Sequence, residues 1–253
     1  MNDQHHQATL APHSSAFFFD LDGTLAEIQP RPDLVFIPPN TLTALRRLHV
    51  AGIPIAVISG RPLQQLDELL APLQLPVAGV HGAERRAADG ALRNLAVDAA
   101  RLRQIERELT QACAEHPGLL LENKGVAFAL HFRLAPELED VARDLAETFV
   151  RRYAEVLTLQ PGKCVFELKP RGASKGEVIR AFMAEPPFNG RQPVFLGDDL
   201  TDEAGFAVVN ALGGRSIKIG SGPTVAGERL ASVAAVGEWL EELLATLSRT
   251  GNS

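Results

Sequence analysis

The residues whose types and spacing indicate chemistry begin with Asp20-Leu21-Asp22-Gly23-Thr24-Leu25, directly after three consecutive phenylalanines. An apolar run that ends in two carboxylates indicates a buried strand that carries acids to the edge of a sheet. Buried carboxylates are unstable unless a cation or protons neutralise them. Gly23 and Thr24 permit a tight turn and offer a hydroxyl and amides, which suits phosphate. The motif predicts a metal and phosphate site, although a strand followed by an acidic turn has the same pattern.

A second group of acids has the same design far away in the sequence. The apolar residues 193–197 lead directly into Asp198, Asp199, Asp202 and Glu203. Taken alone, this segment could be a solvated loop or the acidic first turn of a helix. If both strands belong to one parallel sheet, however, the two groups meet at its carboxyl edge, where open α/β sheets bind ligands. Oxygen ligands without neighbouring histidine or cysteine indicate Mg²⁺ rather than zinc.

Two further residues lie between these groups. Ser59 ends the apolar residues 55–58 and could donate a hydroxyl to phosphate. Lys175 opens an expected helix, with Ser174 and Glu177 at the spacing of a capping box. A cation in the first turn opposes the helix dipole, which favours a functional role for Lys175 over the alternative, a surface lysine. Together the four motifs resemble those of the haloacid dehalogenase superfamily of aspartate-nucleophile phosphatases.

The resemblance implies a role for each residue in phosphoryl transfer. Asp20 is the expected nucleophile, which forms an aspartyl-phosphate. Asp22 is expected to protonate the leaving oxygen and then to activate water. Ser59 and Lys175 are expected to bind the phosphoryl oxygens. The implied Mg²⁺ ligands are Asp20, Asp22 through its main-chain carbonyl, Asp198 and Asp199, while Asp199 and Asp202 hold metal-bound water or orient Lys175.

The resemblance narrows at Arg61 and at the segments 81–84, 122–124, 131–133 and 162–167. Together these segments are similar to those of the trehalose-6-phosphate phosphatases, and the similarity covers about residues 16 to 245. This implies trehalose 6-phosphate as substrate and a functional pairing with trehalose-6-phosphate synthase. A nonreducing disaccharide offers hydroxyls, which paired lysine and glutamate side chains can bind. Such residues alternate along expected hairpins and so share a face, although the solvent side of a small sheet gives the same pattern. The expected substrate contacts are Gly60, Arg61, His81, Glu84, Glu122, Lys124, Lys163 and Glu167, with His131 and Arg133 as weaker candidates.

Composition restricts the class of protein. The chain has 253 residues, 45% of them hydrophobic, and a formal net charge of -6, which argues against nucleic acid or an anionic membrane as main partner. No apolar stretch is long enough to span a bilayer, and residues 1–13 lack a signal-peptide core. Cys113 and Cys164 indicate neither a disulfide framework nor zinc, so a cytoplasmic location is expected.

The pattern of elements predicts an α/β fold, a Rossmann-like parallel-sheet core of haloacid dehalogenase type with an inserted α+β cap domain. Residues 1–15 are expected to form a flexible tail, 16–96 and 169–253 the core, and 97–168 the cap. In the core we expect helices at 39–51, from Pro62 and at 236–248, strands at 55–58, 77–80 and 216–219, and a turn at 88–90. In the cap an α-β-β unit occurs twice, with helices at 99–115 and 136–153, strands at 119–123 and 126–133, and a strand pair around Gln160-Pro161-Gly162.

Other functions remain open at this point. The chain could be another sugar-phosphate phosphatase or a phosphomutase of the same superfamily, or a silent sugar-phosphate sensor. A phosphomutase needs a bisphosphate activator, and the sequence gives no sign of one. A silent sensor is expected to have lost Asp20, Asp22 or Asp198, and all three are present.

Overall fold

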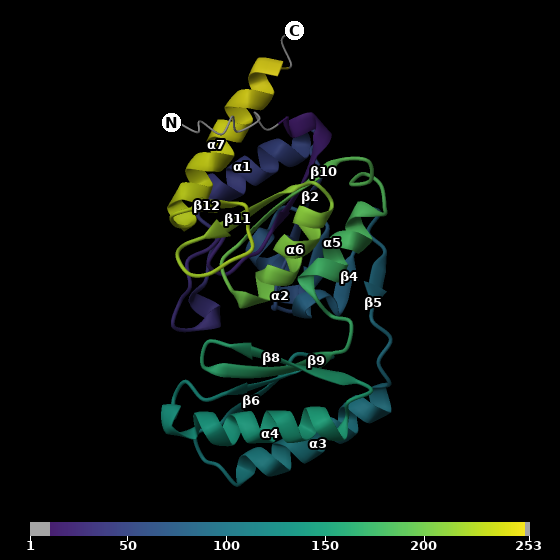
Figure 1. Ribbon diagram of the computed structural model, residues 1–253, viewed down its shortest axis with the longest axis vertical. Coiled ribbons are helices and arrows are strands. Elements are labelled where there is room, and N and C mark those ends of the chain that lie inside the picture. Colours follow the sequence, from purple (N-terminus) through teal and green to yellow (C-terminus); the bar gives the residue numbers. More distant parts are fainter. Residues whose placement is uncertain (1–10, 251–253) are drawn as a thin grey trace, which may run out of the picture.

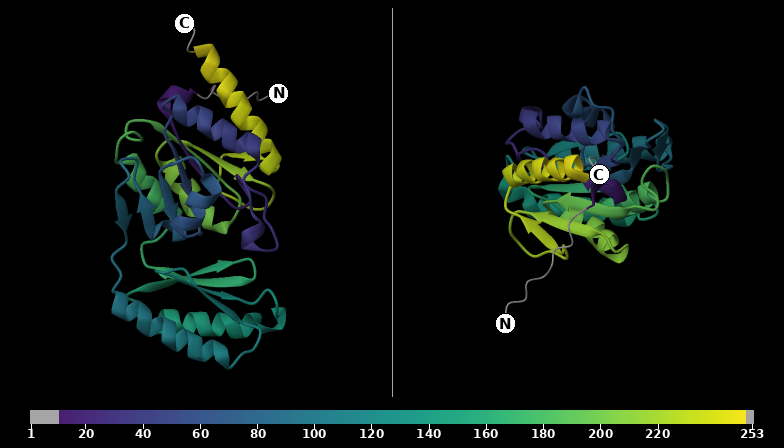
Figure 2. Two further views of the ribbon diagram at one scale, coloured as in Figure 1. Left: turned by 180° about the vertical axis from the view of Figure 1, so that it is seen from behind. Right: turned by 90° about the horizontal axis from the view of Figure 1, so that it is seen from above.

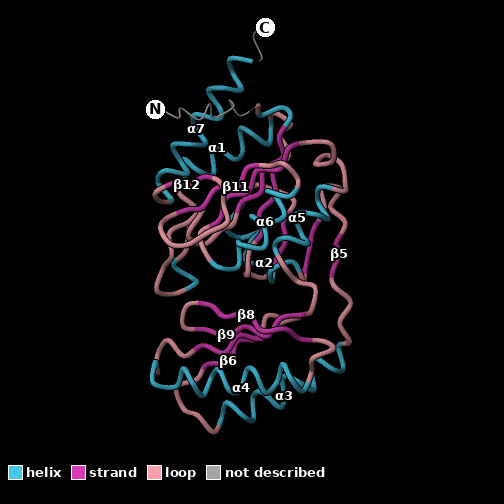
Figure 3. Tube along the Cα trace, viewed as in Figure 1, coloured by secondary structure: helices cyan, strands magenta, loops and turns pink. Residues whose placement is uncertain are grey.

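The computed structural model describes residues 11–250, which form two bodies, one above the other in Figure 1. The upper body is a large sheet with helices on both faces, and the lower one is a small sheet backed by two helices. Figure 3 shows that the cap helices lie on the side of their sheet that faces away from the core. The cap therefore presents a sheet surface, rather than helices, toward the core.

The core sheet contains eight strands in the order β12-β11-β10-β1-β2-β3-β4-β5. The six strands from β12 to β3 in this order are parallel, while β4 and β5 form an antiparallel hairpin at one edge. The strands are β1 (Ser15–Phe19), β2 (Ile55–Ile58), β3 (Val77–Gly79), β4 (Glu84–Arg86), β5 (Leu92–Asn94), β10 (Gln192–Gly197), β11 (Arg215–Ile219) and β12 (Glu228–Leu230).

The phenylalanine run explains how the sheet is covered on both faces. Successive side chains of a strand point to opposite faces. Phe17 and Phe19 accordingly pack into one apolar cluster, and Phe18 packs into another on the opposite side. All three are fully buried, as expected for a central parallel strand. The first cluster includes residues of α1 (Pro39–Val50), α2 (Leu63–Leu70) and α7 (Val233–Thr250), and the second those of α5 (Lys175–Met183) and α6 (Glu203–Ala211).

The cap is the predicted pair of α-β-β units. Its sheet is antiparallel, in the order β6-β7-β9-β8, and its own apolar cluster includes Phe128, Phe149 and Phe166. Figure 2 shows the two bodies from behind, with the chain passing from the core into the cap and back. The elements are α3 (Ala99–Ala114), β6 (Leu120–Asn123), β7 (Phe128–His131), α4 (Glu139–Arg152), β8 (Leu157–Gly162) and β9 (Val165–Pro170).

Most predicted elements are present within a few residues of their expected bounds, but the second cap hairpin is a correction. We expected its turn at Gln160-Pro161-Gly162, whereas β8 continues to Gly162 and the turn is formed by Lys163 and Cys164. Pro161 fits in β8 because β8 is an edge strand, where a missing N–H removes no ladder bond on the open side. Cys164 takes the left-handed conformation that the turn needs, with φ at 61°.

Two of the expected domain limits differ from the bounds of the strands beside them. Regular structure starts before residue 16, because Pro12–Ser14 form a 3-10 turn and β1 begins at the buried Ser15. The rest of the expected tail, residues 1–10, lies outside the described residues. The limit at residue 168 falls inside β9, which runs to Pro170. Between residues 11 and 250 we find no helix with the length and apolar character needed to cross a membrane.

Candidate active site

The two acidic groups meet at the carboxyl edge of the core sheet. β1 and β10 are parallel neighbours, with Phe19 opposite Leu196, and the N–H of Asp20 donates to the Leu196 carbonyl at 2.9 Å. Carboxylate oxygens of Asp20, Asp198 and Asp202 lie within 4.8 Å of one another. Adjacent parallel strands thus join acids that are far apart in the sequence.

Close packing at two glycines fixes this arrangement. Gly197 has no room for a side chain, since a Cβ there would lie 2.3 Å from Cγ of Asp202. Asp202 Oδ2 accepts the N–H groups of Asp198 and Asp199, at 2.9 and 3.0 Å. Gly23 has a φ of 84°, and a Cβ there would lie 2.1 Å from Oδ2 of Asp198. The turn after β1 therefore packs directly against the carboxylate that follows β10.

Lys175 is the cation at the centre of the acids. Its Nζ donates to Oδ1 of Asp20 and to Oδ1 of Asp202, each at 2.6 Å, and its side chain is buried. α5 begins at Lys175 because Ser174 caps it, with Oγ accepting the Glu177 N–H at 3.1 Å. Among the described residues, only this half of the predicted capping box is formed. Oε1 of Glu177 instead lies 3.7 Å from Nε of Arg180.

The carboxylates outnumber the cations beside them. Burial, with the charges of Asp202, Asp198 and Asp199, raises the pKa of Asp20 well above its ordinary value despite Lys175. Burial and the neighbouring acids raise the pKa of Asp198 to about 7. Burial alone would lower the pKa of Lys175, but Asp20 and Asp202 raise it above its ordinary value. The cluster is thus short of positive charge.

These residues fit a hard divalent cation. The donor set consists of carboxylate oxygens, which Mg²⁺ prefers. Among the described residues the buried hydroxyl of Thr24, in the turn after β1, has no hydrogen-bond partner. Asp202 already accepts Lys175 and two amides, whereas Asp199 Oδ1 accepts the N–H and hydroxyl of Thr201 at 2.7 and 2.6 Å. Asp20 and Asp198 are therefore the carboxylates best placed for a cation.

Asp22 and Ser59 are joined through Arg61. Ser59 directly follows β2, is buried, and accepts the Arg61 N–H at 3.2 Å. The Arg61 guanidinium binds Asp22 in a bidentate ion pair, with both N–O distances 2.7 Å. The sequence predicts that Arg61 contacts substrate, and no pattern in the sequence predicts its pairing with Asp22.

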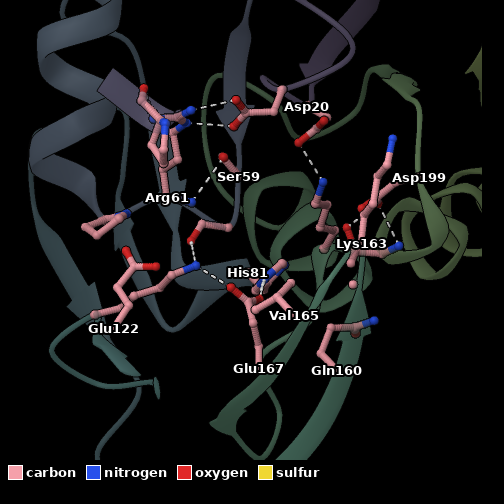
Figure 4. A pocket seen from close by; sticks show the side chains of 18 of the residues that line it. Asp20, Ser59, Arg61, His81, Glu122, Gln160, Lys163, Val165, Glu167 and Asp199 are labelled. Atoms are coloured by element: carbon pink, nitrogen blue, oxygen red, sulfur yellow. Dashed lines mark hydrogen bonds and ion pairs between the residues drawn. The ribbon is translucent and has the colours of Figure 1, made fainter. Parts of the chain in front are cut away.

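Across from these residues, the cap contributes Glu167, which lies between a core residue and a cap residue. One carboxylate oxygen contacts Nε2 of His81 and the other the Lys124 ammonium, whose Nζ also donates to the Gly60 carbonyl at 3.3 Å. Burial would raise the pKa of Glu167, but His81 and Lys124 lower it to about 2. Burial lowers the pKa of His81. In Figure 4 Glu167 and His81 lie together, opposite Asp20 and Ser59.

A pocket of about 250 Å³ lies between the two bodies. It brings together most of the predicted residues from both. Four lie outside its lining. Glu84 Oε2 accepts the Leu63 N–H at 3.2 Å, and Arg133 donates to the Lys163 carbonyl at 3.4 Å. Asp198 and Asp202 lie beside Asp20 in the acidic cluster. The predicted residues that line the pocket are Asp20, Asp22, Ser59, Gly60, Arg61, His81, Glu122, Lys124, Lys163, Glu167, Lys175 and Asp199, together with His131.

Three features of the site were missed by the sequence analysis. Gln160 lines the pocket and accepts Lys169 at 3.1 Å, and burial lowers the pKa of Lys169 to about 8. His131 contacts Glu122 at 2.8 Å, so these two side chains act as a pair. Lys218 reaches the acidic edge from β11, where its Nζ donates to the Asp198 carbonyl. A lysine within an apolar strand was the signal that could have identified Lys218.

Comparison with known proteins identifies the family. Residues 18–234 match the family model described as trehalose-phosphatase. The chain belongs to the trehalose-phosphatase family. It is 53% identical over 235 residues to the trehalose-6-phosphate phosphatase of Escherichia coli strain K12, covering 92% of this chain and 88% of that one. A probable trehalose-phosphate phosphatase of Sinorhizobium fredii is 41% identical, over 92% of this chain and 87% of its own.

Solved structures support the fold. The C-terminal domain of the C. albicans trehalose-6-phosphate phosphatase superposes with a TM-score of 0.79 at 24% identity, over 92% of each chain. A haloacid dehalogenase-like hydrolase from B. subtilis superposes with a TM-score of 0.66 at 16% identity, over 91% of this chain and 99% of that one. The fold is thus of haloacid dehalogenase type with a cap domain.

Proposed function

We propose that this member of the trehalose-phosphatase family hydrolyses trehalose 6-phosphate to trehalose and phosphate in a Mg²⁺-dependent reaction. The observation that carries the proposal is the composition of one pocket. Its core wall has Asp20, Ser59 and Lys175, a set suited to phosphoryl transfer. Its cap wall has Glu122, Lys124, Lys163 and Glu167, which can bind sugar hydroxyls.

In the first step, we assign Asp20 as the nucleophile. Its free oxygen attacks phosphorus, the bond from phosphorus to the sugar oxygen breaks, and an aspartyl-phosphate forms. Asp22 gives its proton to the departing sugar oxygen. In the second step Asp22 takes a proton from water, which attacks the aspartyl-phosphate and releases phosphate and the Asp20 carboxylate. Arg61 now holds Asp22, so substrate binding must release or reorient this pair before the proton transfer.

Ser59 and Lys175 neutralise and orient the phosphoryl oxygens in this scheme. Lys175 can do so because it lies against Asp20 and is held from behind by Asp202. Asp20, Asp198 and the main-chain carbonyl of Asp22 would hold Mg²⁺, with Asp199 beside them. When bound, Mg²⁺ supplies the positive charge that the carboxylates and the phosphoryl group require.

We assign the sugar contacts to both bodies. Glu122, Lys124, Lys163 and Glu167 would contact hydroxyls from the cap, and Gly60, Arg61 and His81 from the core. Glu84 contacts the main chain of Leu63 outside the pocket lining, so its role would be to support the loop before α2. We divide the chain into core residues 16–96 and 169–253 and cap residues 97–168.

The cellular setting follows from the same proposal. The substrate would be made by trehalose-6-phosphate synthase, and the two enzymes would share the cytoplasm. The free thiols of Cys113 and Cys164 agree with a reducing compartment.

A screen of phosphate release tests the function. We expect trehalose 6-phosphate to be cleaved far faster than glucose 6-phosphate, and cleavage to stop when a chelator removes Mg²⁺. Equal rates on both sugars would overturn the substrate assignment. Full activity in chelator would overturn the metal assignment.

A further inference from the structure

Lys218 occupies an unusual place for a lysine. It lies in β11, where Ile217 and Ile219 pack into the apolar cluster on one face of the sheet. Alternation along the strand directs Lys218 to the other face. The residue is only 5% exposed, and it lies opposite Gly197, the last residue of β10, in the strand register. The chain thus brings a buried ammonium to the residue before Asp198.

The partner of this ammonium is main chain, not a carboxylate. Nζ of Lys218 donates to the carbonyl oxygen of Asp198. This is the one hydrogen bond that the Lys218 ammonium makes within residues 11–250. Hydrogen bonds from a charged donor are stronger than neutral ones. A buried ammonium is costly unless it is bonded, so the Asp198 carbonyl and Lys218 hold each other in place.

Asp198 is therefore fixed on each side of its Cα. Its N–H donates to Asp202 Oδ2 at 2.9 Å, and its carbonyl accepts from Lys218. Its carboxylate packs against Gly23 and faces Asp20 within the three-carboxylate cluster. The main chain is occupied with structural bonds while the side chain remains directed at the proposed cation site.

We propose that Lys218 is a positioning residue, which holds the main chain of Asp198 so that its carboxylate meets Mg²⁺ in the correct place. The inference rests on the Mg²⁺ part of the proposed function and not on the identity of the sugar. Residues that orient a metal ligand from behind typically contribute ten- to a hundredfold to metal affinity.

The direction in which Mg²⁺ affinity changes when Lys218 is replaced distinguishes a positioning role from a purely electrostatic one. A cation close to a cation site repels it, so removing Lys218 would strengthen Mg²⁺ binding if its charge were all that mattered. Loss of positioning weakens binding. Titration of the substrate-free protein with Mg²⁺ alone, followed by calorimetry, measures the affinity without any need for turnover.

We expect Lys218→Met to raise the Kd for Mg²⁺ by at least about tenfold. Lys218→Arg, which keeps a charged donor, should restore it to within about threefold of the original chain. Ser216→Ala is the matched control on the same strand and face, because Ser216 Oγ donates to Asn210 and not to the acids. Its Kd should equal that of the original chain.

Several results would overturn the inference. An unchanged or lower Kd in Lys218→Met, even with a lower melting temperature, would mean that the lysine only supports the fold or supplies charge. If Lys218→Met does not fold, Lys218→Gln takes its place, and an unchanged Kd there has the same meaning. If the original chain itself does not bind Mg²⁺, the metal part of the proposed function fails, which is a distinct outcome.

Discussion

The two walls of the pocket differ in how their charges are balanced. Asp20 on the core wall and Glu167 on the cap wall are similarly buried, at 4% and 7% exposure. Yet the pKa of Asp20 is raised by burial and neighbouring acids, while His81 and Lys124 lower that of Glu167 to about 2. The core wall is short of positive charge, whereas the cap wall is already neutralised.

The difference matches the ligands that each wall is proposed to take. A wall short of positive charge suits a metal ion, and a wall of mutually paired charges suits the uncharged hydroxyls of a sugar. The placement differs too. Core groups follow the ends of parallel strands and are fixed by main-chain bonds, but Glu167 and Lys124 reach across from another sheet. In the proposed function the reacting groups belong to the core and most of the sugar contacts belong to the cap, so mutations in the cap should affect recognition more than chemistry.

The strongest test removes the attacking group from the core wall. Asp20→Asn keeps the volume of the side chain but cannot form the aspartyl-phosphate, so turnover should fall by at least about a thousandfold. The metal-free fold should be retained, because the change removes one of several mutually repelling acids. Circular dichroism and phosphate release measure the two effects. More than trace activity at saturating Mg²⁺ would contradict the assignment of the nucleophile.

Changes on the cap wall should affect specificity instead. Glu167→Gln and Lys163→Ala should each lower kcat/KM for trehalose 6-phosphate by about ten- to a hundredfold, or about 1.5–3 kcal/mol. Slow cleavage of a small aryl phosphate, which does not reach the cap, should be largely kept. The comparison of both substrates with each variant is the measurement. Equal losses on the two substrates would show that these residues serve folding or cap closure.

The charge difference also predicts how pH acts on the metal-free protein. Asp198 has a pKa of about 7 in the folded chain, above its ordinary value of 3.8. The stability that its protonated form contributes is fully present below the ordinary pKa and is lost as pH rises through about 7. Mg²⁺ replaces the lost proton, so it should raise the melting temperature more at about pH 8 than at about pH 5.5.

Thermal melts with Mg²⁺ and with chelator at both pH values measure this increment. Asp198→Asn is the control, and it should make the increment small at both. An equal increment at both pH values in the original chain would argue against competition between protons and metal.

The smallest expected changes in stability and turnover concern the N-cap residues of two helices. Ser174 caps α5 of the core, and Asp98 caps α3 of the cap by accepting the Ala100 N–H at 2.8 Å. Replacing either by alanine should cost about 1 kcal/mol of unfolding free energy. Only Ser174→Ala should also slow turnover, by a few-fold, because the next residue is Lys175. Denaturant melts and kcat values test this, and equal kcat losses would mean that the caps act only through stability.

The meeting of the core carboxylates and Lys175 could be predicted from the sequence because each part is a local pattern. An apolar strand that ends in Asp20 or Asp198 marks a sheet edge, and the parallel arrangement brings the edges together. The cap hairpins could be predicted as well, but not the second turn, because Pro161 lies on an open edge where proline is tolerated. The pairing of Arg61 with Asp22, 39 positions away, left no local pattern. Lys218 lies in a predicted strand, but its partner is the main-chain carbonyl of Asp198, and no sequence pattern identifies such a partner.

The connection from β9 to α5 has a mechanical consequence. Glu167 lies on β9, Lys175 is the first residue of α5, and only residues 171–174 separate the strand from the helix. The Ala173 N–H donates to the Pro170 carbonyl at 3.1 Å, so this link is a tight turn rather than a slack tether. A shift of the cap strand would therefore move the start of α5, which carries Lys175. We expect the cap to do more than cover the pocket. A sugar bound at Glu167 should change the position of the Lys175 ammonium through residues 171–174.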